Sequence, residues 1–342
     1  MTPTIAIIGS GFGMYCLLPA FCNTENCHVV SISGKNSQRM SSYCKKYNVK
    51  HYHDWKEMLQ KEQPDAIAIA VIPKYQFEIA KYALEHKIAV FAEKPLSIDY
   101  EKCLELCHLA KKHRLPNMVD FEFPEIPEWK KTKKILEDNV IGKIFDIEIN
   151  WTFLSHDLKN HINSWKTDVS KGGGALSFFA SHVFNYVEYF VGKIETIDCS
   201  LGYSELSINK GETEIEMNLK FENGCKGKIN IDVSNSNNSK HTIVFHGSTG
   251  QLQLQNNANN VVDNFELILN SQKNEIIESK DATNIQNPEL DPRVKIVSLL
   301  ARKFIHWCNS GIPQKPDFQN GMRVQELIDL ARTSNSNAKY NN

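Results

Sequence analysis

The apolar positions of the 342-residue chain follow two different patterns, and the change comes near residue 143. In the first part, short continuous apolar runs alternate with stretches of helical periodicity. Such runs are typical of strands buried on both faces, and their alternation with helices is typical of a parallel sheet. We predict strands at 4–8, 28–33, 49–52, 66–71, 88–91 and 116–121, and helices at 15–21, from 54, and at 76–85, 98–113 and 127–138.

From Lys143 onward, apolar and polar residues alternate, which predicts antiparallel strands with one buried face. We expect these strands at 143–153, 214–221, 226–233, 241–245 and 265–269, and helices at 175–190, 294–308 and 320–332. The predicted fold class is an α/β N-terminal doubly wound parallel sheet of the Rossmann type plus an α+β C-terminal domain with an open, mostly antiparallel sheet.

The length of the chain exceeds that of one ordinary core and predicts two domains. We place the first domain at 1–122 and the second at 123–290. The C-terminal helices are placed at 291–334, and residues 335–342 are expected to form a frayed tail.

The composition excludes several classes of protein. Hydrophobic residues make up 41% and charged residues 23%, as in soluble globular proteins. A net charge of −1 gives no basic field for nucleic acid, and no apolar run approaches the length that crosses a bilayer. Nine cysteines without a Cys-x-x-Cys pair indicate neither a zinc site nor a disulfide framework. Met1 runs almost directly into the first strand, so we expect a reduced, cytoplasmic protein without metal.

A glycine turn follows the first predicted strand. Gly9, Gly11, Phe12 and Gly13 lie between that strand and a helix, where backbone amides can approach a pyrophosphate closely. Gly9 and Gly11 fit the first two positions of the dinucleotide-binding pattern, whereas Met14 occupies the third. The context of strand before and helix after favours a dinucleotide site over an ordinary glycine turn.

The end of the second strand indicates which dinucleotide is bound. An NAD site usually has an acid about 20 residues after the glycines, where it holds the ribose hydroxyls. Here Gly34 stands at that position, and Ser33, Lys35 and Arg39 could surround a 2′-phosphate with donors and positive charge. The alternative is that Lys35 and Arg39 are only the solvated start of a helix. The missing carboxylate favours NADP(H).

A charged pair, Glu93 and Lys94, follows the strand at 88–91 and is locked by Pro95. The carboxyl edge of such a sheet is where ligands bind. A partly desolvated lysine there can polarise a carbinol or carbonyl oxygen and have its pKa lowered toward neutrality. Glu93 could hold the lysine or the neighbourhood of the cofactor. The alternative is a turn with a surface Glu-Lys pair.

Three glycines at 172–174 make a flexible entry to the predicted helix at 175–190, which carries His182 about two turns in. A lone histidine in a buried helix is usually a satisfied core group. However, the glycine turn, the Glu-Lys-Pro element and this glycine run with His182, in that order, resemble the Gfo/Idh/MocA family of nicotinamide-dependent oxidoreductases. The resemblance extends from residue 4 to 334, and Glu-Lys-Pro is its most specific motif.

The resemblance implies roles for particular residues. Lys94 and His182 would handle the substrate proton, the Lys94–Pro95 bond would be cis, and Pro73 and Gln76 would lie on the nicotinamide side. The second domain would bind substrate and form a homodimer or homotetramer through its sheet. The sequence differs from the family pattern at two positions that usually carry an acid. Phe178 replaces an aspartate one turn before the histidine, and Asn185 replaces an acid three residues after it.

Three further residues are candidates for substrate contact. Trp165 and Lys166 lie in a polar and aromatic loop that suits a sugar ring or a phosphate, although an ordinary surface loop is an equal alternative. Tyr186, one turn after His182, could supply a hydroxyl, although buried aromatics more often serve packing.

We therefore predict an NADP(H)-preferring oxidoreductase that transfers hydride between nicotinamide and a carbinol or ketone carbon of a sugar, polyol or sugar nucleotide. One alternative is a catalytically silent member that binds dinucleotide as a sensor or partner-binding protein, prompted by Phe178 and Asn185. Another is reduction of a non-sugar carbonyl or double bond.

Overall fold

The structure is a computed structural model that describes residues 2–235, 239–258, 262–270, 274–277 and 290–335. Of the predicted tail, residues 336–342 lie outside the described residues. The chain divides into two compact units, Met1–Glu122 with Ile285–Gln325 and Phe123–Asn284 with Glu326–Asn342. The last helix, α10 (Phe318–Ser334), contributes residues to both units.

Six parallel strands form the sheet of the first unit, in the order β3-β2-β1-β4-β5-β6. Every residue of β4 and β5 is buried, which explains their continuous apolar runs. The sheet confirms the predicted doubly wound arrangement. Its strands are β1 (Thr4–Ile8), β2 (His28–Ser33), β3 (Lys50–Tyr52), β4 (Ala66–Ile69), β5 (Ala89–Ala92) and β6 (Asn117–Val119).

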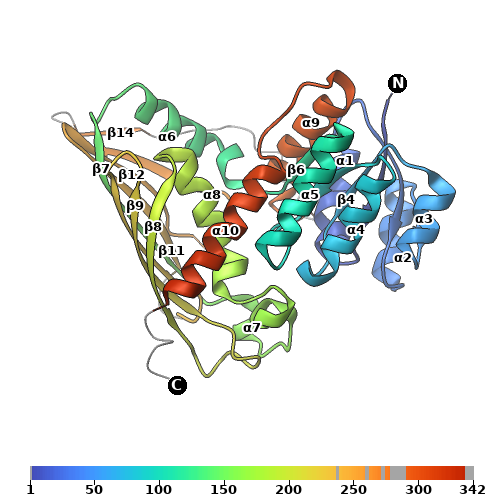
Figure 1. The fold of residues 1–342 in the computed structure, drawn as a ribbon, viewed down its shortest axis with the longest axis horizontal. Helices are drawn as coiled ribbons and strands as arrows, with labels where there is room; N and C mark the ends of the chain where they lie inside the picture. The colour runs from blue at the N-terminus through green and yellow to red at the C-terminus, as the bar shows by residue number, and fades with distance from the viewer. Residues whose placement is uncertain (1, 236–238, 259–261, 271–273, 278–289, 336–342) are drawn as a thin grey trace. The chain divides into compact units, whose positions relative to one another are not determined.

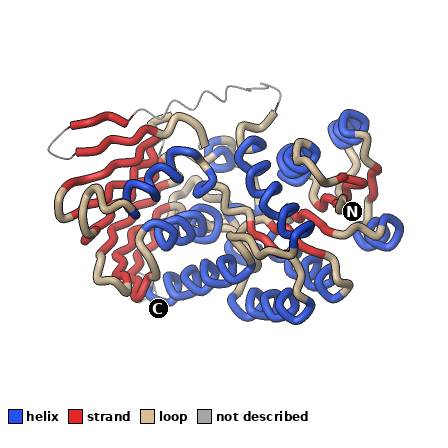
Figure 2. The backbone as a smooth tube through the Cα atoms, turned by 90° about the horizontal axis from the view of Figure 1, so that it is seen from above, coloured by secondary structure: helices blue, strands red, loops and turns tan. Residues whose placement is uncertain are grey.

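Helices lie on both faces of this sheet (Figure 2). Ser37, Asp54 and Asp99 cap three of them by accepting a backbone N–H of the first turn. A further helix, α9, packs against α1 and closes the core of the unit. The helices are the π-helical turn η1 (Gly13–Leu17) continued by α1 (Leu18–Cys22), then α2 (Gln38–Tyr47), α3 (Trp55–Glu62), α4 (Pro73–Glu85), α5 (Tyr100–His113) and α9 (Val294–Ser310).

The strand order reverses beside β1, which pairs with β2 on one side and with β4 on the other. Backbone bonds draw the strand ends together, since the Gly9 amide donates to the Ser33 carbonyl at 2.9 Å and the Ala70 amide donates to the Ile8 carbonyl at 2.8 Å. Ligands of such sheets bind outside the carboxyl ends of the strands at the point of reversal. The glycine turn therefore lies where a dinucleotide would bind.

Eight strands form the sheet of the second unit, in the order β14-β13-β12-β11-β7-β10-β9-β8. Among the strands that the structure describes in this sheet, only β10 and β7 pair in parallel, so the sheet is mostly antiparallel, as predicted. Burial alternates residue by residue along β9, so one face is buried and the other exposed. The strands are β7 (Ile144–Thr152), β8 (Ile194–Gly202), β9 (Glu214–Phe221), β10 (Lys226–Asp232), β11 (Lys240–Gly247), β12 (Gly250–Asn256), β13 (Glu266–Asn270) and β14 (Asn274–Ile277).

The helices of this unit gather on one face of its sheet (Figure 1). Aromatic rings fill the space beneath them, with Trp129 stacked on Phe190 at 5.6 Å between centroids and Trp151 stacked on His241 at 4.5 Å. The helices are η2 (Phe123–Glu125), α6 (Pro127–Glu137), α7 (His156–Lys159), the short turns η3 (Trp165–Thr167) and η4 (Val169–Lys171), and the π-helical turn η5 (Leu176–Ala180) continued by α8 (Ser181–Phe190). None of the helices built by the described residues combines the length and apolar character needed to cross a membrane.

Candidate active site

The glycine turn has the geometry that a pyrophosphate requires. Gly9 has φ +137°, and a Cβ there would lie 2.2 Å from the Ala70 carbonyl oxygen, so only glycine fits. Gly11 is exposed, and a Cβ on it would meet nothing within 4 Å, so the space beside it is open to a ligand. Gly13 is buried, and its Cβ would lie 3.3 Å from the Ile8 carbonyl oxygen, so it allows close packing of η1 on β1.

An arginine that sequence reasoning missed lies beside this turn. The Arg293 guanidinium carbon lies 4.7 Å from the centroid of the Phe12 ring, within cation–π distance. Both oxygens of Asp291 accept hydrogen bonds from Arg293, at 2.8 and 2.9 Å, which fixes the guanidinium in place. Arg293 is distant from the turn in the sequence, so no local pattern could have identified it.

The end of β2 approaches the turn closely. A Cβ on Gly34 would lie 2.8 Å from the Cβ of Ser10, so Gly34 is needed for this approach. Ser33 is buried, whereas Lys35 and Arg39 are exposed. The Arg39 guanidinium carbon lies 5.6 Å from the centroid of the Tyr15 ring, which draws its positive charge toward η1. The structure therefore brings Arg39 beside the helix that follows the glycines.

The Glu-Lys-Pro turn follows β5 at the same edge of the sheet, and the Lys94–Pro95 bond is cis. Gln76, on α4, holds this turn, because its Nε2 lies within hydrogen-bond distance of the carbonyl oxygens of Glu93 (2.5 Å), Pro95 (3.0 Å) and Leu96 (3.3 Å). Pro73 is buried at the start of α4. The side chain of Gln76 is thus committed to the turn.

Lys94 is buried, with 8% of its surface exposed, and burial lowers the pKa of its amine. The Lys94 backbone amide donates to Glu93 Oε2 at 2.9 Å. Three carboxyls surround the lysine: Glu93, Asp120 and Glu122, which we call the acidic cluster. Burial raises the pKa of all three, that of Glu93 to about 7. Lys94 therefore lies among buried acids, in a site that favours the neutral forms of both the amine and the carboxyls.

Sequence reasoning missed Asp120 and Glu122 because it followed the end of β5 and not the end of its neighbour. Both residues come directly after β6, which pairs with β5. The carboxyl ends of adjacent parallel strands meet at one edge, so an acid at the end of the predicted strand at 116–121 and another just after it were an available signal.

His182 lies on α8 in the second unit, with 6% of its surface exposed. Its ring meets Phe123 edge to face, at 4.9 Å between centroids. Tyr186, one turn later, is fully buried, and its hydroxyl lies 3.0 Å from Nε2 of His241. Burial lowers the pKa of His241 to about 3, so this ring is neutral at neutral pH. Tyr186 and His241 therefore form an internal pair that supports α8.

The predicted substrate loop lies against Phe178. The ring of Trp165 meets that of Phe178 edge to face, at 5.5 Å between centroids. The Lys166 ammonium lies 5.3 Å from the same ring and 3.6 Å from a carboxylate oxygen of Asp157. These side chains are only partly buried. Together they form a patch of aromatic rings beside one cation.

The glycine run is closely packed, and the predicted flexible entry to the helix is wrong. A Cβ on Gly173 would lie 2.0 Å from the Trp165 carbonyl oxygen, and the Gly174 amide donates to the Lys166 carbonyl at 2.8 Å. Gly172 and Gly174 also have positive φ, at +90° and +86°. The glycines therefore let the Trp165–Lys166 segment pack onto the start of η5.

One group of side chains has the spacing of a metal site. Ligand atoms of Asp146 and Glu148, on β7, and of His246, on β11, lie within 4.8 Å of one another. Glu148 is exposed and the other two are half-buried. His246 Nε2 lies 3.7 Å from Glu148, which an ordinary ion pair explains. No second feature at this group points to a metal, so we assign none.

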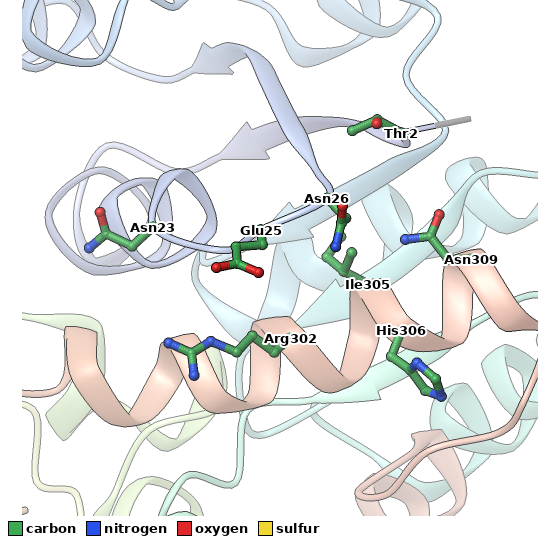
Figure 3. A pocket seen from close by; sticks show the side chains of 8 residues that line it. All are labelled: Thr2, Asn23, Glu25, Asn26, Arg302, Ile305, His306 and Asn309. Carbon is green, nitrogen blue, oxygen red and sulfur yellow. The ribbon is translucent and has the colours of Figure 1, made fainter.

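A pocket of about 700 Å³ lies in the first unit, among residues that precede β1 and β2 and along one side of α9 (Figure 3). These residues lie at the amino ends of the strands, whereas the glycine turn lies at their carboxyl ends. The pocket includes no predicted site residue. It is lined by Thr2, Asn23, Glu25, Asn26, Arg302, Ile305, His306 and Asn309.

Two family models match the chain. One, described as an oxidoreductase family with an NAD-binding Rossmann fold, matches residues 4–121. The other, described as the C-terminal alpha/beta domain of an oxidoreductase family, matches residues 133–341. Both carry the family designation Gfo/Idh/MocA.

Similar proteins agree with these matches. An uncharacterized oxidoreductase of Synechocystis is 25% identical over 344 residues, which cover 96% of this chain and 93% of that protein. Levoglucosan dehydrogenase of Pseudarthrobacter phenanthrenivorans is 26% identical over a stretch that covers 52% of this chain and 47% of that protein. Among solved structures, levoglucosan dehydrogenase in complex with NADH has a TM-score of 0.85 and a sequence identity of 19%. A 3-ketoreductase of Actinomadura kijaniata in complex with NADP has a TM-score of 0.81 and a sequence identity of 18%. Each match covers 98% of this chain and 98% of the solved chain.

Proposed function

Because the chain belongs to the Gfo/Idh/MocA family of oxidoreductases, we propose that it is an NADP(H)-preferring enzyme that interconverts a carbinol and a ketone on a sugar, polyol or sugar nucleotide. The observation that carries this proposal is Lys94, a buried amine with a lowered pKa at the carboxyl edge of the parallel sheet. Such an amine can take a proton from a hydroxyl, and the ammonium it becomes can return one to a carbonyl.

The glycine turn and the end of β2 would hold the cofactor. Gly9 allows the turn to approach the Ala70 carbonyl, and Gly13 allows η1 to pack on β1. The open space beside Gly11 admits a pyrophosphate at the start of η1. Ser33, Gly34, Lys35 and Arg39 would surround the adenosine ribose. When bound, a nicotinamide dinucleotide supplies the hydride acceptor or donor for the reaction.

A preference for NADP(H) rests on charge at the end of β2. Gly34 cannot carry the acid that binds ribose hydroxyls, because a side chain there would collide with Ser10. Lys35 and Arg39 are exposed and could pair with a 2′-phosphate. Solved relatives do not decide the matter, since one carries NADH and another NADP.

The proton chemistry would be carried by Lys94 and by His182, since lysine and histidine both serve as general acids and bases. Glu93 and Gln76 would hold Lys94 in place through the turn. Trp165 and Lys166 would contact the substrate, since an aromatic ring beside a cation suits the faces and hydroxyls of a sugar. Tyr186, with its hydroxyl beside His241, would support α8 without touching substrate.

Two further parts of the proposal concern the whole protein. The exposed face of the eight-stranded sheet would join copies of the chain into a homodimer or homotetramer, because a one-sided sheet leaves a broad surface for a partner. Nine free thiols suit a reducing compartment, which favours the cytoplasm.

Lys94→Ala and His182→Ala test the assignment. NADP⁺ reduction is screened with sugars, polyols and sugar nucleotides, and cofactor binding is followed by nicotinamide fluorescence. Each variant should lose roughly 10²- to 10⁴-fold in turnover while NADPH affinity stays within a few-fold, because the residues act on the proton. Full activity in both variants would refute these roles. Tight NADPH binding without turnover on any of these substrates would favour a sensor.

A further inference from the structure

Asp120 is the least explained side chain near Lys94. It follows β6 directly, and its backbone amide donates to the carbonyl of Ala92 at 2.9 Å. Ala92 is the last residue of β5 and precedes Glu93 and Lys94, so the backbone places Asp120 next to the lysine turn. The residue is 0% exposed, and within the described part of the chain neither of its carboxyl oxygens has a hydrogen-bond partner.

Such a carboxyl is not stable as an anion. A buried carboxylate normally accepts several hydrogen bonds or pairs with a cation. Arg293 is bonded to both oxygens of Asp291, and Lys94 also faces Glu93 and Glu122. Three ionised acids would leave excess negative charge in this buried site even if Lys94 were an ammonium. At least one acid must therefore keep its proton at neutral pH.

The groups that face Asp120 indicate which acid that is. They are Glu93 and Lys94 after β5, Glu122 after β6, Arg293 ahead of α9 and the buried Cys16 thiol on η1. Glu93 accepts a hydrogen bond from the Lys94 amide, which favours its charged form. Asp120 accepts none, and burial raises its pKa well above the usual value for aspartate. Of the three acids, Asp120 is the one whose carboxyl oxygens have no hydrogen-bond partner among the described residues, which makes it the candidate for the neutral acid.

We propose that Asp120 is a positioning residue that holds a proton beside Lys94 and exchanges charge with it during turnover. In the oxidative direction, the Lys94 amine takes the proton of the substrate hydroxyl and becomes an ammonium. Asp120 then releases its proton through water, on the side of the less buried Glu93, and becomes a carboxylate. One proton enters and one leaves, so the net charge of the acidic cluster with Lys94 is unchanged. The reductive direction reverses each step.

This role rests on the proposed function of Lys94, but its test does not require turnover. A protonated carboxylic acid has an infrared carbonyl band separate from that of a carboxylate. The difference spectrum of wild type minus Asp120→Asn at neutral pH should show this band, lost in the variant. Glu122→Gln is the matched control, because it removes a neighbouring acid and should leave the band. Absence of the band in the wild-type protein would overturn the proposal.

Isotope labelling covers the case in which Asp120→Asn fails to fold. Wild-type protein grown with carboxyl-¹³C aspartate should shift an acid band, separately from any band of Glu93, whose pKa of about 7 lets it respond to ¹³C glutamate. A band that responds only to labelled glutamate would show that Glu93 or Glu122 holds the proton, and would overturn the assignment to Asp120.

The exchange with Lys94 is tested by Lys94→Met in the full-length protein. Lys94 lowers the pKa of Asp120, so its removal should raise the pH at which the acid band disappears by about one unit or more. An unchanged midpoint would show that the two groups do not exchange charge. If the enzyme turns over substrate but shows no acid band, only the inference about Asp120 is refuted. If the acid band is present but no substrate is turned over, Asp120 holds a proton and the oxidoreductase proposal is refuted.

Discussion

At the scale of single residues, the end of β2 shows how one steric requirement bears on cofactor choice. Gly34 is required because any side chain there would collide with Ser10. The same requirement removes the acid that would bind two ribose hydroxyls. The charged side chains that follow at this strand end, Lys35 and Arg39, are both positive and exposed.

Arg39→Ala and Lys35→Ala should weaken NADPH binding by about tenfold or more each, since a charge-assisted bond to phosphate contributes about 1.5–3 kcal/mol. NADH affinity should change little, because NADH lacks the 2′-phosphate. Fluorescence titration with both cofactors measures the two effects. Lys45→Ala, an exposed lysine on the same helix, is the control. Equal losses for NADH and NADPH would contradict a contact with the 2′-phosphate.

The residues of the candidate site were predictable only in part. Glycines and the Glu-Lys-Pro turn carry local patterns, so they could be placed at strand ends from the sequence. Gln76 was assigned to the nicotinamide side by resemblance, but its amide bonds the turn that starts at Glu93. Arg293 and Asp120 reach the same region from distant parts of the chain, and no local pattern encodes such tertiary contacts.

At the scale of elements, the last turn of α10 is held by an ion pair in which the carboxylate, that of Glu212, is buried. Arg332 lies 3.2 Å from a carboxylate oxygen of Glu212 and 2.8 Å from the Ser177 hydroxyl. Glu212 also accepts the Leu176 amide at 3.3 Å. The last turn of α10 is thereby joined to the start of η5, the turn that leads into α8 and His182.

Arg332→Met should lower the free energy of unfolding by about 3–5 kcal/mol, because it leaves the Glu212 carboxylate buried without its cation. Chemical denaturation measures the loss. The double variant Arg332→Met with Glu212→Gln should recover much of it, since no uncompensated charge remains. A double variant no more stable than the single one would contradict this explanation, and Arg302→Met, on α9, serves as a control.

Elements were predicted best where periodicity is strong. The strand at 214–221 was predicted with the observed bounds of β9, whose burial alternates strictly. The strands β8, β12 and β14 were missed. Only two leucines alternate with glutamines along β12, which is a weak signal. The helix α4 begins at Pro73, before the predicted Gln76, because proline suits the first turn of a helix.

At the scale of the whole molecule, stability should depend on pH through His241. Burial lowers its pKa from 6.5 to about 3, so the unfolded chain binds a proton that the folded protein does not. The free energy of unfolding should therefore fall as the pH drops from about 6.5 toward 3, at about 1 kcal/mol per pH unit from this group. Acids of raised pKa, such as Glu93, act in the opposite direction.

The difference between wild type and His241→Gln isolates this contribution. The variant should lose less stability between pH 6.5 and 5 than the wild type, by about 1–2 kcal/mol. Urea denaturation at several pH values measures it, and His108→Gln, at an exposed position, is the control. Parallel pH profiles for wild type and His241→Gln would contradict a neutral, buried His241.

The central claim is that this chain is a nicotinamide-dependent oxidoreductase that favours NADP(H). Its most direct test is titration of the purified wild-type protein with NADPH and, in parallel, with NADH, followed by nicotinamide fluorescence. We predict saturable binding of NADPH at least about tenfold tighter than that of NADH, as a charge-assisted contact to the 2′-phosphate would give. Tighter binding of NADH would refute the preference, and binding of neither cofactor would contradict the account.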